Sequence, residues 1–166
     1  MPTAPFAVAT PLTARNALPS ADFADSYMTT VLDANANAPE LAARAFARMP
    51  AWVMRLLHLR NVVVKPFGLR PAPDDTLPAD RQIGFFPVVS SDRNRVVLGF
   101  DDSHLDFRIV IDVVNGAQQT SDITATTLVK RNNTLGYAYL FAVMPFHKRI
   151  VPAMLARLAL PAPAPN

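Results

Sequence analysis

The sequence predicts an α+β domain in which a curved antiparallel sheet packs against one long C-terminal helix. Residues 83–132 form apolar and polar runs separated by turn signals, which is typical of hairpin-linked strands. Residues 136–160 carry apolar side chains at intervals of one, three or four, which gives a helix one broad apolar face. With 166 residues, of which 51% are apolar and 17% charged, the chain can build one core and is not a disordered protein. We expect one domain over residues 20–160, with a disordered Pro/Ala-rich leader (1–19) and a disordered tail (161–166).

The first half is expected to supply one strand and two short helices. Ser26–Asp33 is the first predicted strand because it is rich in Thr, Val and Tyr. A helix is predicted from Pro39, since proline suits the first helical position, to Met49. Pro50 separates this helix from a second one over Ala51–Val64. Residues 71–80 are expected to form a loop.

Four consecutive strands are predicted in the second half, over residues 83–90, 95–101, 104–114 and from the following turn to 132. The third strand alternates strictly, so its apolar side chains share one face: Leu105, Phe107, Ile109, Ile111 and Val113. Asn115-Gly116 then predicts a tight hairpin turn because both residues tolerate positive φ. Strands linked in this way form an antiparallel meander.

Gly136–Leu160 is predicted to be the long final helix, kinked at Pro145 and Pro152. Its broad apolar face is the obvious cover for the apolar face of the sheet. The arrangement predicted from the pattern alone is a helix-grip fold.

The composition excludes several common sites. The chain has no Cys and a single Glu, Glu40, so a thiol nucleophile, a disulfide, a cysteine-bound metal and a His-Glu-x-x-His zinc helix are all excluded. The glycines are too widely spaced for a dinucleotide fingerprint or a phosphate-binding loop. We therefore expect no cofactor.

Charge and hydropathy also limit the partners. The net charge is +3, but the Arg residues are scattered and aromatic residues do not interleave with them, so nucleic acid is not an expected partner. The longest apolar run, Leu135–Phe146, ends at the basic residues 147–149 and is too short to span a membrane. The prolines of the leader interrupt any secretory signal, and we expect a cytoplasmic protein of undetermined oligomeric state.

The densest polar cluster lies between Asp101 and Arg108. If the strand begins at His104, then His104, Asp106 and Arg108 share a face, where a His beside a carboxylate could act as an acid–base group and Arg108 could hold an anion. His147 could approach from the final helix. The simpler interpretation is an Asp-rich turn followed by the solvated face of an edge strand. A metal site could be built from Asp102, His104, Asp106 and His147, but only the composition favours it, and we predict no metal site.

The aromatic residues allow two interpretations. They could fill the core, or they could line a hollow for an apolar ligand between the sheet and the last helix. The residues expected to line such a hollow are Phe85, Phe100, Phe107, Tyr139, Val143 and Phe146.

Several motifs together resemble a known bacterial family, the domain of unknown function 2867. They include Trp52-Val53, Pro66–Leu69, Ile83–Val88, Leu98–Arg108, Thr126–Val129, Leu135-Gly136 and Pro145–His147, and the segment Leu105-Asp-Phe-Arg108 is the most specific. The resemblance covers about Leu18 to Leu160 and implies a START-like helix-grip fold without an established activity. Similar domains also follow NAD-binding domains in longer bacterial proteins, but this chain lacks the glycine fingerprint.

Three functions remain open at this point. The first is a binding module that holds a small apolar or amphipathic ligand, with His104, Asp106, Arg108 and His147 at its polar end. The second is an enzyme of the cyclase or hydrolase type that uses the same His/Asp/Arg cluster. The third is a module that contacts a protein or a membrane surface through a sheet edge or through residues 147–149.

Overall fold

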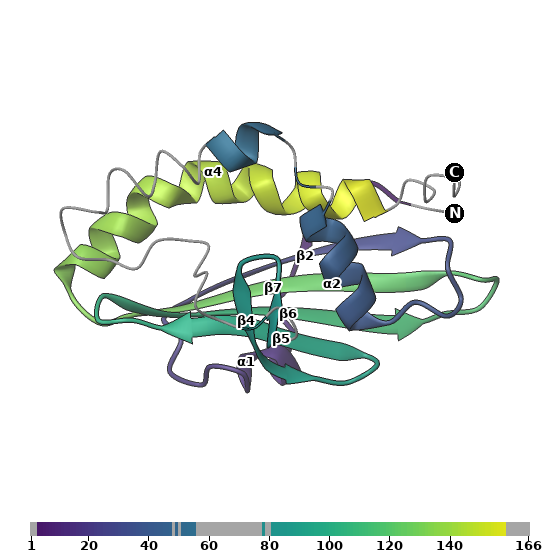
Figure 1. Cartoon of the computed structure of the whole chain (residues 1–166), viewed down its shortest axis with the longest axis horizontal. Coiled ribbons are helices and arrows are strands. Elements are labelled where there is room, and N and C mark those ends of the chain that lie inside the picture. The colour runs from purple at the N-terminus through teal and green to yellow at the C-terminus, as the bar shows by residue number, and fades with distance from the viewer. Residues whose placement is uncertain (1–2, 48, 50, 56–77, 79–80, 159–166) are drawn as a thin grey trace.

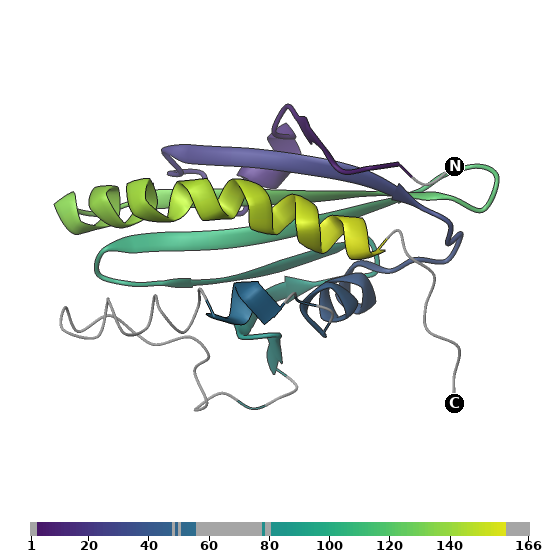
Figure 2. The same cartoon turned by 90° about the horizontal axis from the view of Figure 1, so that it is seen from above.

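A computed structural model describes residues 3–47, 49, 51–55, 78 and 81–158. The described residues form a seven-stranded antiparallel sheet, and the long C-terminal helix covers one of its faces (Figure 1, Figure 2). Along the sheet the strand order is β1-β2-β7-β6-β5-β4-β3. The strands are β1 (Phe6–Val8), β2 (Phe23–Val31), β3 (Gln82–Ile83), β4 (Phe86–Ser91), β5 (Arg95–Asp101), β6 (Leu105–Asn115) and β7 (Ser121–Arg131). The predicted α+β helix-grip class is confirmed.

The alternation predicted for β6 is also confirmed. Leu105, Ile111 and Val113 are buried on the face that the helices cover, whereas Val110 is buried on the opposite face. The central strands are therefore apolar on both faces. Such strands need cover on both sides of the sheet.

The predicted hairpin between β6 and β7 is confirmed, but its turn is longer than the tight turn expected at Asn115-Gly116. Asn115 still pairs with Ser121, and the Ser121 hydroxyl donates to the Asn115 side chain at 2.8 Å. This pairing leaves a loop over residues 116–120, in which Gln118 and Gln119 have φ values of 58° and 57°. The positive φ angles thus fall on the two glutamines instead of on Asn115-Gly116.

Helix α4 (Thr134–Leu158) runs across one face of the sheet (Figure 2). The Asn133 side chain accepts a hydrogen bond from Gly136 N at 3.1 Å and caps its first turn. The helix continues through Pro145 and Pro152, and its axis bends along its length (Figure 1).

Helix α2 (Ala38–Ala47) covers the same face beside the C-terminal end of α4. It corresponds to the predicted helix that begins at Pro39. Residues 51–55 are helical too, while the rest of the predicted second helix and most of the expected loop lie outside the described residues.

The N-terminal segment differs from the expected disordered leader. Residues 6–8 form β1, which pairs with β2, and α1 (Leu12–Arg15) follows. Ala14 and Leu18 pack against the sheet face opposite α4, where Val97, Val110 and Leu128 are buried. The prediction failed because it treated the Pro/Ala tract as unable to contribute to a core, whereas its few apolar side chains complete one. The expected disordered tail lies outside the described residues.

Among the described residues, no helix combines the length and the apolar character needed to cross a membrane.

Candidate functional site

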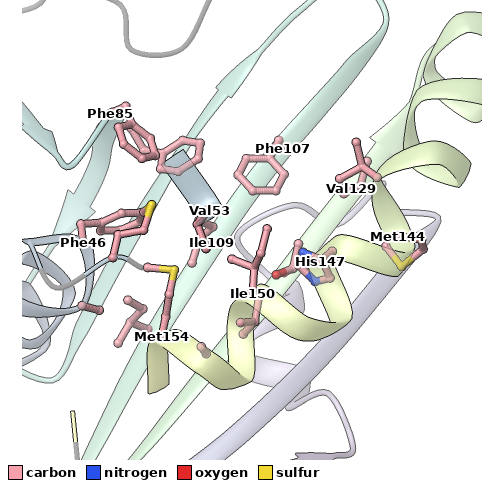
Figure 3. Close-up of a pocket in the computed structure, with 18 of the residues that line it drawn as sticks. Phe46, Val53, Phe85, Phe107, Ile109, Val129, Met144, His147, Ile150 and Met154 are labelled. Carbon is pink, nitrogen blue, oxygen red and sulfur yellow. The ribbon is translucent and has the colours of Figure 1, made fainter. Parts of the chain in front are cut away.

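A cavity of about 220 Å³ lies between the sheet and α4 (Figure 3). Carbon and sulfur atoms dominate its described lining. The lining side chains that carry nitrogen or oxygen are His104, Thr127, Tyr139 and His147. The other described lining residues are Ala45, Phe46, Met49, Val53, Phe85, Phe86, Phe100, Leu105, Phe107, Ile109, Ile111, Ala125, Val129, Leu140, Val143, Met144, Ile150, Val151, Met154, Leu155 and Leu158.

Phenylalanine rings form one wall of the cavity. The rings of Phe46, Phe85, Phe86, Phe100 and Phe107 contact one another in a continuous chain, with centroids 5.5–6.3 Å apart. They come from α2, the β3–β4 turn and strands β4, β5 and β6, so the fold gathers them from parts of the chain that are far apart in sequence.

A glycine in the β3–β4 turn allows this wall to close. Gly84 has a φ of 64°, and a Cβ built there would lie 2.6 Å from Phe46 Cγ. A side chain at position 84 would therefore push Phe46 away from the turn, and its backbone conformation would be strained as well.

One face of α4 forms the opposite wall, with His147, Ile150 and Met154 on successive turns (Figure 3). Tyr139 and Val143 line the cavity as expected. Phe146 does not line the cavity, and its side chain is 46% exposed. It directly precedes the lining residue His147 on α4, and successive helical positions differ by about 100° around the axis.

His147 reaches from α4 to a carboxylate on β2. Its Nε2 lies 3.0 Å from both carboxylate oxygens of Asp25, and the two side chains are 13% and 20% exposed. Asp25 sits between Phe23 and Tyr27 on the face of β2 that α4 covers, and Thr127 pairs with it on β7. Burial, and then the negative charge of Asp25, raise the pKa of the Tyr27 hydroxyl.

His104 marks the end of the cavity near the start of α4. The residue lies in the turn before β6 and is only 1% exposed, with its ring edge-on to Tyr139 at 5.4 Å. Asp102 Oδ2 lies 3.6 Å from His104 Nδ1. The α4 backbone comes very close here, since a Cβ built on Gly136 would lie 2.1 Å from the His104 carbonyl oxygen.

Asp106 and Arg108 do not line the cavity, which corrects their assignment to the ligand site. Strand alternation places them on the face away from α4, because β6 begins at Leu105 and His104 lies before it. Asp106 accepts a hydrogen bond from Asn132 at 3.0 Å. Arg108 Nη1 donates to Asp101 at 2.7 Å, and this hydrogen bond lowers the pKa of the Asp101 carboxyl group. The shared face predicted for His104, Asp106 and Arg108 is therefore wrong.

The ligands considered for a metal site are also not assembled. Asp106 lies across the sheet from the cavity, and His147 is held by Asp25. Within the described ranges, no group of three or more His, Asp or Glu side chains could hold a metal ion.

The sequence reasoning missed Asp25. The predicted first strand began at Ser26, whereas β2 begins at Phe23. Strand side chains alternate between the two faces, so residues two apart share a face. Asp25 stands midway between Phe23 and Tyr27, and this spacing could have shown that a carboxylate lies on the apolar face. The aromatic wall was also only partly anticipated, because Phe46 and Phe86 were not among the expected lining residues.

Comparison with known proteins gives a family match and a match to a solved structure. No curated protein matches the chain. The solved structure of the di-domain ARO/CYC BexL from the BE-7585A biosynthetic pathway is 13% identical, with a TM-score of 0.33. That match covers 89% of this chain and 54% of the solved chain, so this chain spans about half the length of that protein. The family of proteins of unknown function DUF2867 matches residues 17–154, and the chain belongs to that family.

Proposed function

We propose that this domain binds a small apolar or amphipathic molecule between the sheet and α4. The observation that carries the proposal is the 220 Å³ cavity with its largely apolar lining. A cavity of about 150 Å³ lined by Leu, Ile and Phe stays dry and binds benzene. Water gains few hydrogen bonds in such a space, so an apolar molecule of suitable size occupies it more favourably than water does.

The polar groups of the lining occupy only part of the cavity. His104 and Tyr139 lie at the start of α4, and His147 lies about 12 Å further along at 1.5 Å per residue. Beyond Ile150 the described lining has no side-chain nitrogen or oxygen and ends at Leu158. An amphipathic ligand would therefore place its polar group toward His147 and its hydrocarbon toward Leu158.

Thermal unfolding with defined probes tests this function. Naphthalene and 1-octanol, each added to the purified full chain, represent an apolar and an amphipathic ligand. A probe that binds only the folded state at 100 times its Kd stabilises the protein by about 2.7 kcal/mol, which raises the Tm by about 5–11 °C. Native mass spectrometry of the same samples reports the stoichiometry. No shift and no bound mass with either probe would refute the proposal.

One observation favours a second function, an acid–base enzyme. His147 and Asp25 form a His–carboxylate pair in the cavity wall, although two members of the cluster first considered for catalysis, Asp106 and Arg108, lie on the other face. A carboxylate that holds one imidazole nitrogen leaves the other available to take a proton. Deuterium exchange of the α-protons of 2-tetralone in D₂O, followed by NMR, tests this function. A rate equal to that of the His147→Leu variant would rule it out.

A further inference from the structure

We propose that the ligand is a small aromatic molecule with a phenolic or enolic hydroxyl, and that this hydroxyl binds His147 Nδ1. The inference rests on the proposed function of the cavity and adds the chemical class of the ligand and its point of polar contact. Three features of the site lead to it.

The first feature is the state of the His147 ring. A carboxylate only accepts hydrogen bonds, so the 3.0 Å contacts to Asp25 require a proton on Nε2. In the neutral ring, Nδ1 then carries a lone pair and accepts a hydrogen bond. Among the residues that the structure describes, none is hydrogen-bonded to Nδ1, and the ring lies in the cavity wall (Figure 3). A ligand hydroxyl supplies the matching donor.

The second feature is the aromatic wall. Five phenylalanine rings in continuous contact lie across the cavity from α4, and Met144 and Met154 project from that helix. Aromatic rings gain edge-to-face and sulfur contacts on such a surface beyond the burial of their area, and an aliphatic chain does not. A volume about one and a half times that of a benzene-binding cavity suits a fused two-ring molecule.

The third feature is the charge of the lining. No Lys or Arg is found among the described residues that line the cavity, whereas the Asp25 carboxylate lies directly behind His147. A ligand carboxylate would be repelled by Asp25 and would lose its hydration without gaining a cation. A neutral hydroxyl avoids both costs, so the site favours an alcohol of acidic character over an acid.

Calorimetry with three probes of the same ring size tests the inference: naphthalene, 2-naphthol and 2-naphthoate. The wild-type chain is expected to bind 2-naphthol at least as tightly as naphthalene, because the bond to His147 replaces the bond to water. 2-Naphthoate is expected to bind most weakly of the three.

The variant His147→Leu removes the acceptor but leaves Asp25 as a buried charge. The double variant Asp25→Leu/His147→Leu removes both groups, so folding does not depend on an isolated carboxylate. In the double variant the affinity for 2-naphthol relative to naphthalene should fall about three- to tenfold, the range of one net hydrogen bond. Lys148→Ala, an exposed neighbour on α4, is the matched control and should leave the ratio unchanged.

The outcomes separate the two proposals. Binding of naphthalene with the same 2-naphthol ratio in the wild type and the double variant would overturn the hydroxyl contact and keep the apolar binding function. Absence of binding by all three probes would overturn both. A change in the ¹⁵N chemical shift of His147 Nδ1 on addition of 2-naphthol, but not of naphthalene, would support the contact directly.

Discussion

Filling the cavity from the sheet should stabilise the free protein and abolish ligand binding at the same time. Ala125 on β7 is the smallest side chain in the sheet-side lining; it pairs with Ile111 of β6 and belongs to the same buried cluster as Leu155 of α4. The substitution Ala125→Ile adds a β-branched side chain, which suits a strand.

The size of the effect follows from the added carbon atoms. Isoleucine has three more side-chain carbons than alanine, and each buried methylene contributes about 0.8 kcal/mol. Ordering the new side chain costs about 0.5–1 kcal/mol. The net gain is about 1.5 kcal/mol, which corresponds to a rise in Tm of about 3–6 °C for a chain of this size.

Differential scanning calorimetry of wild type and variant, each with and without naphthalene, measures both effects. Ala142→Ile on the exposed side of α4 is the matched control, and its Tm should stay close to that of the wild type. A fall in Tm for Ala125→Ile would mean that the space is already filled, because overpacking a dense core costs about 1–3 kcal/mol. If the Tm rises but naphthalene still raises it further by the same amount, naphthalene does not bind in the space that the Ala125→Ile side chain fills, and the reasoning is refuted.

Three further predictions concern the frame around the cavity. Gly136→Ala should lower the free energy of unfolding by about 2–3 kcal/mol in urea titrations, because its Cβ would meet the His104 carbonyl oxygen at 2.1 Å. Leu18→Ala should cost about 2–3 kcal/mol in the same assay, since Leu18 is 7% exposed and covers the outer face of the sheet. The pKa of Asp101, followed by carboxyl ¹³C NMR, should lie below its ordinary value and return to it in Arg108→Leu. Because the pKa of Asp101 is lower in the folded state, its contribution to stability is present above the unfolded-state pKa and is lost as the pH falls through the folded-state pKa. The Asp101 side chain is 64% exposed, so this contribution should stay below about 1 kcal/mol.

Each of these predictions has a clear contrary result. Equal stability of Gly136→Ala and the wild type would mean that α4 does not approach the turn so closely. A Leu18→Ala variant as stable as the wild type would mean that the N-terminal segment does not pack on the sheet. An Asp101 signal that titrates identically with and without Arg108 would show that the 2.7 Å contact is absent in solution.

Periodicity predicted the strands of this fold well because the sheet is antiparallel and one face of each strand meets a helix. The alternation from Leu105 to Val113 assigned the correct side chains to the covered face. It could not reveal that Val110, on the other face, is buried by the N-terminal segment. That contact joins positions almost a hundred residues apart, and the Pro/Ala composition of the segment gave no indication of it.

The site was harder to predict because two of its polar residues lie at the starts of strands, where the predicted boundaries were wrong. His104 lies in a turn, so the strand pattern assigned it to the wrong face together with Asp106. Asp25 lies two residues inside a strand whose predicted start was too late. Only the fold brings Asp25 to His147, across 122 positions of sequence.

The position of the cavity follows from how α4 is attached. Its buried residues are Gly136 and Leu140 near one end and Leu155 and Leu158 at the other, and none lies between them. The first end is held by the close approach of Gly136 to the His104 turn, and the second packs with α2. A helix that completed a filled core would have its most buried residues in the middle of its contact face. The middle of α4 reaches the sheet through the His147–Asp25 contact, but its apolar side chains there line the cavity and are only partly buried, so a bound molecule would complete the core at that point.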